Sequence, residues 1–303
     1  MRGSRRIPDH WREAFYQTGW PWLKTGLWTS QKSLDRLLAL HPPPTMPGAA
    51  VAALTMISII ICSVDEARFQ RVSQTYARVF RGEEFEVVGI HDARGLAEGY
   101  NRGIKSSRGE IVILSHDDID VINDDFKDRL LGHLGAADLL GVAGATRVRK
   151  GAWIAAGPPY IYGQIAQRDA REKSFMVMIW GTPTRRVEQI KVMDGVFLCG
   201  KRQVMEAVPF DEQTFPGFHL YDIDFTFRAH QAGFRLAVCC DLLLIHESFG
   251  KFDTQWEHYV RVFGEKYAAQ MDPVPERSFQ VTAVKVRRRE ELPEVMIPAQ
   301  WGP

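Results

Sequence analysis

The stretch Glu110-Ile111-Val112-Ile113-Leu114-Ser115-His116-Asp117-Asp118-Ile119-Asp120 decides the fold. Its apolar half is too short for a typical helix and ends abruptly in polar residues, which predicts a buried parallel strand over residues 111–114. Three carboxylates follow at the C-terminal end of that strand, the edge where open α/β sheets bind ligands. They repel one another unless a proton, a basic group or a hard cation such as Mg²⁺ or Mn²⁺ compensates their charge. The stretch predicts a metal site or, alternatively, a solvated acidic turn that caps the next helix.

Strands and helices alternate on both sides of this stretch. The β-branched run 56–64 is typical of a strand, and residues 65–80 have the pattern of a helix. The alternation predicts an α/β fold with a doubly wound, mainly parallel sheet flanked by helices. Further strands are expected at residues 86–90, 140–143, 191–198 and 235–245. Further helices are expected at residues 100–107 and 123–134 (capped by Asn123), as a short helix through Met205, and at residues 228–231.

Length, charge and cysteine content narrow the class of protein. The chain has 303 residues and a net charge of +1, which allows one large domain with appendages and gives no reason to expect a nucleic-acid partner. Its four cysteines lack CxxC or zinc spacing, so we expect reduced, buried thiols. The apolar segment 49–62 is shorter than the roughly 20 residues of a membrane-spanning helix, and no secretory signal is evident. The sequence therefore predicts a cytoplasmic protein that does not span a membrane.

Three regions are expected. Residues 1–50 form a tryptophan-rich helical extension, which either packs onto the main domain or faces a partner or a membrane interface. The main domain covers residues 51–270, and a C-terminal tail, 271–303, includes an expected edge strand at 279–286. Residues 146–190 are rich in Gly, Pro and aromatic residues and are predicted to be an irregular functional loop. Trp180 in this loop could form the wall of a ligand site or pack in the core.

Later acidic and histidine residues are expected to join residues 116–120. Asp222, Asp224 and His246 each border a predicted core element, so one sheet edge could gather them. Two carboxylates and an imidazole could hold a divalent metal and leave a carboxylate as general base. In the alternative interpretation, His246 is an ordinary hydrogen-bonded histidine, and the two aspartates are a helix cap and its first-turn acid.

The order of several motifs resembles the glycosyltransferase family 2-like group, which are nucleotide-sugar enzymes with the GT-A fold. The resemblance covers residues 56–267 and leaves both ends of the chain unexplained. The matching motifs are residues 58–62, Tyr100-Asn101-Arg102-Gly103-Ile104, Gly109-Glu110, His116-Asp117-Asp118-Ile119, Asp194-Gly195-Val196-Phe197-Leu198, Phe210-Asp211-Glu212, residues 218–225, Ala232-Gly233-Phe234 and Ile245-His246-Glu247-Ser248.

This resemblance implies a role for each matching site residue. Asp222 becomes the general base of an inverting transfer, although Tyr221-Asp222 stands where the family often has Glu-Asp. A Mn²⁺ or Mg²⁺ cofactor is implied, held by Asp118 and His246. The implied contacts to the nucleotide-sugar donor are Ser63, Asp92, Asn101 and Asp117.

The predicted function is therefore metal-dependent transfer of a sugar from a nucleotide-sugar donor. The acceptor is unknown and could be a carbohydrate, a lipid-linked molecule or a protein. A non-catalytic nucleotide- or sugar-binding scaffold of the same fold is the alternative. A metal phosphohydrolase also stays open, whereas a Rossmann oxidoreductase is disfavoured because no GxGxxG motif follows Ile61.

Overall fold

The computed structural model describes residues 56–181, 184–250, 252–273 and 281–297. The N-terminal extension with its predicted helices lies outside these residues. The first half of the described chain contains β1 (Ile57–Cys62), α3 (Glu66–Val79), β2 (Phe85–Ile90), α4 (Leu96–Ser106), β3 (Ile111–Ser115), β4 (Ile119–Val121), α5 (Phe126–Leu134), β5 (Leu139–Gly141), β6 (Ala143–Ala145) and the 3₁₀ helix η2 (Trp153–Ala156). The second half contains β7 (Ile161–Asp169), β8 (Ser174–Trp180), β9 (Val192–Met193), β10 (Phe197–Lys201), α6 (Arg202–Ala207), α7 (Tyr221–Gln231), β11 (Leu236–Val238), β12 (Leu244–His246), α8 (Thr254–Lys266), η3 (Ala268–Gln270), β13 (Thr282–Val286), η4 (Arg289–Glu291) and α9 (Leu292–Met296).

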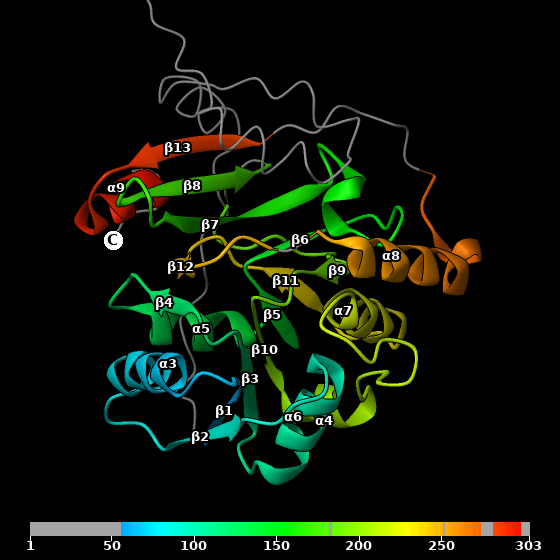
Figure 1. The fold of residues 1–303 in the computed structure, drawn as a ribbon, viewed down its shortest axis with the longest axis horizontal. Helices are drawn as coiled ribbons and strands as arrows, with labels where there is room; N and C mark the ends of the chain where they lie inside the picture. Colours follow the sequence, from blue (N-terminus) through cyan, green and yellow to red (C-terminus); the bar gives the residue numbers. More distant parts are fainter. Residues whose placement is uncertain (1–55, 182–183, 251, 274–280, 298–303) are drawn as a thin grey trace, which may run out of the picture.

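A six-stranded sheet forms the base of the molecule, with strand order β11-β5-β10-β3-β1-β2 (Figure 1). β1 pairs in parallel with β2 and β3, while β10 is antiparallel to both of its neighbours, β3 and β5. The predicted strand at 111–114 is confirmed as β3, every residue of which is buried. The α/β fold with a doubly wound, mainly parallel sheet of GT-A type is confirmed.

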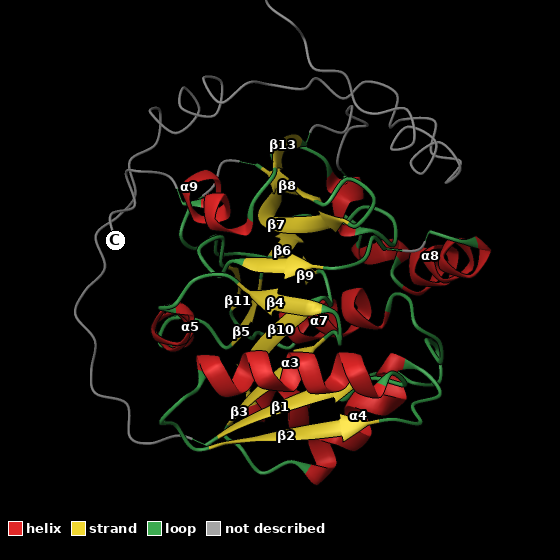
Figure 2. Cartoon of the chain, turned by 60° about the vertical axis from the view of Figure 1, so that its left-hand side comes forward, coloured by secondary structure: helices red, strands yellow, loops and turns green. Residues whose placement is uncertain are grey.

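Helices cover both faces of this sheet because its strand residues alternate (Figure 2). Ile57, Ile59 and Ile61 of β1 pack in one cluster with residues of α3 and α5. Ile60 points to the opposite face and joins residues of α4, α6 and α7. A continuous apolar strand such as β1 therefore needs a helix on each side, as the sequence predicted.

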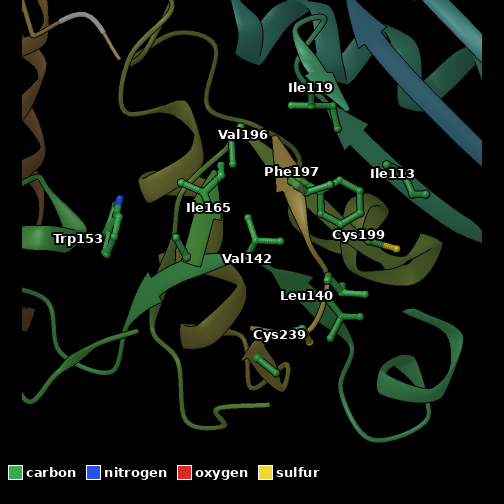
Figure 3. Close-up of a cluster of buried hydrophobic side chains, with 14 of the residues drawn as sticks. Ile113, Ile119, Leu140, Val142, Trp153, Ile165, Val196, Phe197, Cys199 and Cys239 are labelled. Atoms are coloured by element: carbon green, nitrogen blue, oxygen red, sulfur yellow. The ribbon is translucent and has the colours of Figure 1, made fainter. Parts of the chain in front are cut away.

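A second, mostly antiparallel sheet lies above the first, with strand order β13-β8-β7-β12-β4 and with β6 and β9 beside β7. Its centre is the hairpin of β7 and β8, so the prediction of an irregular loop over residues 146–190 was wrong. The expected edge strand near the C-terminus is confirmed as β13, which pairs with β8. One hydrophobic cluster joins the two sheets; Figure 3 shows Ile113 and Phe197 of the first sheet near Ile119 and Ile165 of the second.

Three predicted strands are each divided between the two sheets. Residues 140–143 form the end of β5 and the start of β6, and residues 191–198 are split between β9 and β10. The run 235–245 is likewise divided into β11 and β12, and Asp241 lies buried in the turn between them. The apolar pattern does not show where the chain passes from one sheet to the other, because the residues before and after that point are equally buried.

Two further expectations have different outcomes. Helix α5 begins at Phe126 with Asp125 as its N-cap residue, so the predicted capping role of Asn123 was wrong. Asn123 instead donates a hydrogen bond to the carbonyl of Asp241 and accepts one from the amide of Leu243, which fixes the start of β12. All four cysteines are free thiols, and all but the partly exposed Cys62 are buried, as expected. Among the described helices, none combines the length and apolar content needed to cross a bilayer.

Candidate active site

The site lies at the carboxyl edge of the parallel strands of the first sheet. β1 ends at Cys62 and β3 at Ser115, so the residues that follow them, Ser63 and His116, both leave the sheet at this edge. β10 runs the other way and its first residue, Phe197, pairs with Ser115. The segment that precedes β10 therefore lies at this same edge, where the amide of His116 donates to the carbonyl of Val196 at 3.2 Å.

The two central aspartates of the acidic stretch face different partners. Asp117 accepts a hydrogen bond from Ser63 Oγ at 2.6 Å and lies 3.8 Å from Arg68 Nη1. Asp118 is buried, and its Oδ1 lies 3.2 Å from His246 Nε2. The backbone supports this second pair, since Ile119 and His246 are partners in the antiparallel pairing of β4 with β12. The predicted pair of metal ligands is thus brought together from two distant parts of the chain.

His116 completes a cluster with this pair. One potential ligand atom from each of His116, Asp118 and His246 lies within 4.8 Å of the other two, and no other such cluster of three occurs in the part of the chain that the structure describes. Two imidazole nitrogens and one carboxylate oxygen can hold a divalent metal ion. The residues present therefore fit the metal that the sequence implied, and they add a ligand that it did not assign.

Charges inside the cluster are balanced for metal binding. Burial alone would raise the pKa of Asp118, but the hydrogen bond and charge of His246 outweigh it and hold the pKa of this carboxyl well below its usual range. Burial and the neighbouring His246 lower the pKa of His116. Asp118 is thus an ionised carboxylate and His116 a neutral imidazole at physiological pH, the protonation states in which these two side chains can bind a metal.

Asp120, the last acid of the stretch, is used elsewhere. Its carboxylate accepts hydrogen bonds from Thr75 and Arg78 of α3 and from Arg289 of η4. Asp120 therefore ties α3 and the C-terminal segment to β4.

Asp222, the predicted base, lies in the first turn of α7. Its Oδ2 accepts a hydrogen bond from the amide of Gly195 at 2.7 Å. A β-carbon at Gly195 would collide with the hydroxyl of Tyr221 and the Cβ of Asp222, so only glycine allows this approach. Burial and the nearby Asp194 carboxylate raise the pKa of Asp222 to about 7. A carboxylate with this pKa can accept a proton effectively near neutral pH.

Asp194 is a site residue that the sequence placed in a motif but gave no role. Its Oδ2 accepts a hydrogen bond from Trp153 Nε1 at 3.0 Å, and its Oδ1 accepts one from the amide of Val196 at 3.0 Å. Trp153 in turn meets Trp180 edge to face, with 5.1 Å between ring centroids. Trp180 is buried, so of its two expected roles the structure shows core packing.

Of the other expected donor contacts, Ser63 and Asp92 follow strands β1 and β2 at this edge, whereas Asn101 does not follow a strand. Ser63 is buried beside Asp117. Asp92 follows β2, where its exposed carboxylate forms a two-pronged pair with Arg102. Asn101 lies within α4, and its amide group exchanges two hydrogen bonds with the backbone of Phe210. Asn101 thus has a structural partner, and its contact with a nucleotide stays a prediction.

Asp224 anchors the helix that carries the base. Its fully buried carboxylate accepts hydrogen bonds from Arg228 at 2.8 Å, Lys266 at 2.6 Å and Tyr267 at 2.6 Å. Lys266 and Tyr267 lie at the C-terminal end of α8, so this carboxylate joins α7 to α8. The sequence suggested that Asp224 is only an acid in the first turn of a helix. In the structure it also connects two helices.

Replacing Asp224 with alanine is expected to lower the free energy of unfolding by about 3–5 kcal/mol, because two cations and a hydroxyl lose their buried partner. Urea unfolding followed by circular dichroism measures the change. Asp211→Ala is the matched control: Asp211 also pairs with Lys266, at 2.7 Å, but is partly exposed. Its loss should cost about 1 kcal/mol or less. Equal effects of the two substitutions would contradict the anchoring role of Asp224.

The fold is of the GT-A class, and His116, Asp118 and His246 form a cluster of possible metal ligands at the carboxyl edge of its first sheet. The chain belongs to the glycosyltransferase-like family, whose model matches residues 58–267. It is therefore a glycosyltransferase. No curated protein matches the sequence significantly.

Solved structures of similar fold include several glycosyltransferases. A mannosyltransferase from Pyrobaculum calidifontis, in complex with GDP-Man and Mn²⁺, is 12% identical with a TM-score of 0.45, covering 86% of this chain and 72% of its own. GalNAc-T7 with UDP, GalNAc and Mn²⁺ is 11% identical with a TM-score of 0.44, covering 71% of this chain and 50% of its own. TarS from S. aureus, residues 1–349, is 12% identical with a TM-score of 0.42, covering 72% of this chain and 67% of its own.

Proposed function

We propose that the protein transfers a sugar from a nucleoside-diphosphate donor to an acceptor hydroxyl with inversion at the anomeric carbon. The observation that carries this proposal is the contact between two chemically different groups of residues. His116 belongs to the metal cluster, and its Nε2 lies 3.2 Å from the hydroxyl of Tyr221, the residue directly before the base Asp222. A site for the leaving diphosphate and a site for acceptor activation thus adjoin each other.

Each residue has a defined task in this reaction. Asp118 and His246, joined by His116, would hold the metal, which when bound stabilises the negative charge that develops on the departing diphosphate. Asp222 takes the proton from the acceptor hydroxyl as its oxygen forms a bond to the anomeric carbon. The bond from that carbon to the phosphate oxygen breaks on the opposite side, and the nucleoside diphosphate leaves. Ser63, Asp92, Asn101 and Asp117 are proposed to bind the donor.

Mn²⁺ together with a nucleoside diphosphate is expected to raise the melting temperature. A ligand at 100 times its Kd stabilises the folded state by about 2.7 kcal/mol. For a domain of this size, that corresponds to a shift of about 5–10 °C. Differential scanning fluorimetry across nucleoside diphosphates, each with and without Mn²⁺, measures it.

The outcomes of this panel separate the possible functions. No shift with any nucleotide in the presence of Mn²⁺ would contradict a donor site. A shift without release of nucleoside diphosphate from any donor, over a broad acceptor panel, would favour the non-catalytic scaffold. Release of phosphate from simple phosphate esters would favour a phosphohydrolase.

A further inference from the structure

The two ring nitrogens of His116 face two different groups. Nδ1 lies 4.0 Å from Oδ1 of Asp118, and the ring is 5.5 Å from that of His246. Nε2, at the other side of the ring, lies 3.2 Å from the hydroxyl of Tyr221. Asp118 and Tyr221 therefore lie near different nitrogens of His116.

Proton positions follow from this arrangement. A histidine nitrogen that binds a metal carries no proton, so the other nitrogen must be the donor. With Nδ1 directed to the metal, the Nε2 proton is donated to the Tyr221 hydroxyl oxygen. That hydroxyl lies 3.5 Å from the carbonyl of Gly195, to which it donates in turn. In both hydrogen bonds, from His116 to Tyr221 and from Tyr221 to Gly195, the donor points away from Asp118 and His246.

Tyr221 is held firmly enough to set the orientation of His116. Its side chain is buried, with its ring centroid 5.7 Å from that of Tyr100 and 6.1 Å from that of Phe210. The preceding residue, Leu220, has a left-handed backbone conformation with φ of 61°, which costs a non-glycine residue on the order of 1 kcal/mol or more. The fold accepts this cost and brings Tyr221 and Asp222 together into the first turn of α7.

We propose that Tyr221 is a positioning residue that holds His116 in the orientation and tautomer needed for Nδ1 to serve as the third protein ligand of the metal. The inference rests on the metal site of the proposed function and adds to it a specific ligand atom and its support. It also gives a role to the tyrosine that stands where the similar family often has glutamate. Because Asp222 is the next residue, one turn of α7 supports both the metal site and the base.

Binding of Mn²⁺ to the full-length protein tests this proposal without any turnover. Electron paramagnetic resonance of free Mn²⁺ gives the Kd in the absence of nucleotide. Tyr221→Phe is expected to weaken binding by about 10–100-fold, the usual effect of losing the hydrogen-bond partner of a metal-bound histidine. His116→Ala should weaken binding at least as much. The double variant should bind like His116→Ala alone, since Tyr221 acts through His116.

Tyr267→Phe is the matched control, because it also removes a buried tyrosine hydroxyl that contacts α7, through Asp224. It should lower the melting temperature and leave the Kd for Mn²⁺ unchanged. The positioning role is overturned if Tyr221→Phe binds as tightly as wild type, or if it weakens binding further in the His116→Ala background. Should Tyr221→Phe not fold, unchanged binding by His116→Ala overturns the proposal by itself. A wild-type protein that binds no Mn²⁺ would overturn the proposed function as well, which separates the two failures.

Discussion

Replacing Asp222 with asparagine is expected to lower the turnover number by about 10²–10⁴-fold, the usual contribution of a general base. Asparagine has the same shape and can still accept the hydrogen bond from the Gly195 amide. It also removes the repulsion between the carboxylates of Asp194 and Asp222. The fold should therefore survive, and the melting temperature should not fall. Release of nucleoside diphosphate from the donor measures the loss of turnover.

The pH profile of the wild-type enzyme provides a second measure of the same residue. The pKa of Asp222 is raised to about 7, and only the deprotonated carboxylate can accept the acceptor proton. Activity should therefore fall about tenfold per pH unit below this value and level off above it. An acid limb near pH 4, the ordinary range of an aspartate, would contradict this assignment. So would an Asp222→Asn variant that retains wild-type turnover.

Asp118→Ala is expected to remove both the Mn²⁺-dependent rise in melting temperature and the activity. It deletes the carboxylate at the centre of the metal cluster and leaves two imidazoles without an anionic partner. Stabilisation of the leaving group by a metal is worth several kcal/mol, so activity should fall by about 10³-fold or more. Fluorimetry with Mn²⁺ and the same release assay measure the two effects.

Asp120→Asn is the control for this substitution, since Asp120 lies in the same stretch but pairs with Arg78 and Arg289. It should lower stability yet keep the response to Mn²⁺. Retention of that response in Asp118→Ala, or its loss in Asp120→Asn, would contradict the assignment of the metal ligand. Asp222→Asn completes the comparison, because it should lose turnover while keeping the response to Mn²⁺.

The first sheet could be predicted because its strands are apolar runs with clear ends. β1 and β3 each pass from β-branched residues to a polar residue at the edge where the site lies. The β7–β8 hairpin could not be predicted in the same way. Gln164 is buried at its centre, where its Nε2 donates hydrogen bonds to the carbonyls of Cys240 and Met296, and Gly163 packs closely against Ala143. A glutamine and a glycine are unusual inside a strand, and the contacts that stabilise them here come from residues distant in the sequence.

The candidate site, like the fold, could be predicted from the sequence only in part. Asp118 and His246 could be predicted because each lies at the border of a core strand, and the structure brings them to 3.2 Å. His116 precedes two aspartates, which was a signal for metal binding, although nothing in the sequence indicates that its ring turns toward Asp118 and Tyr221. Asp194 shifts the pKa of Asp222 only through space, because β10 reverses direction beside β3. Predicting such a pKa shift requires the register of the strands, which the sequence pattern does not provide.

The antiparallel pairing of β4 with β12 has a consequence for how the protein folds. It joins Ile119 to His246, and the amide of Glu247 donates to the carbonyl of Asp118 beside it. Neither partner can find the other through local structure, so the metal ligands meet only after the long chain segment between them has been ordered. A folding intermediate with one sheet formed would lack the complete site. A metal held by Asp118 and His246 would therefore stabilise only the domain in which both sheets have assembled.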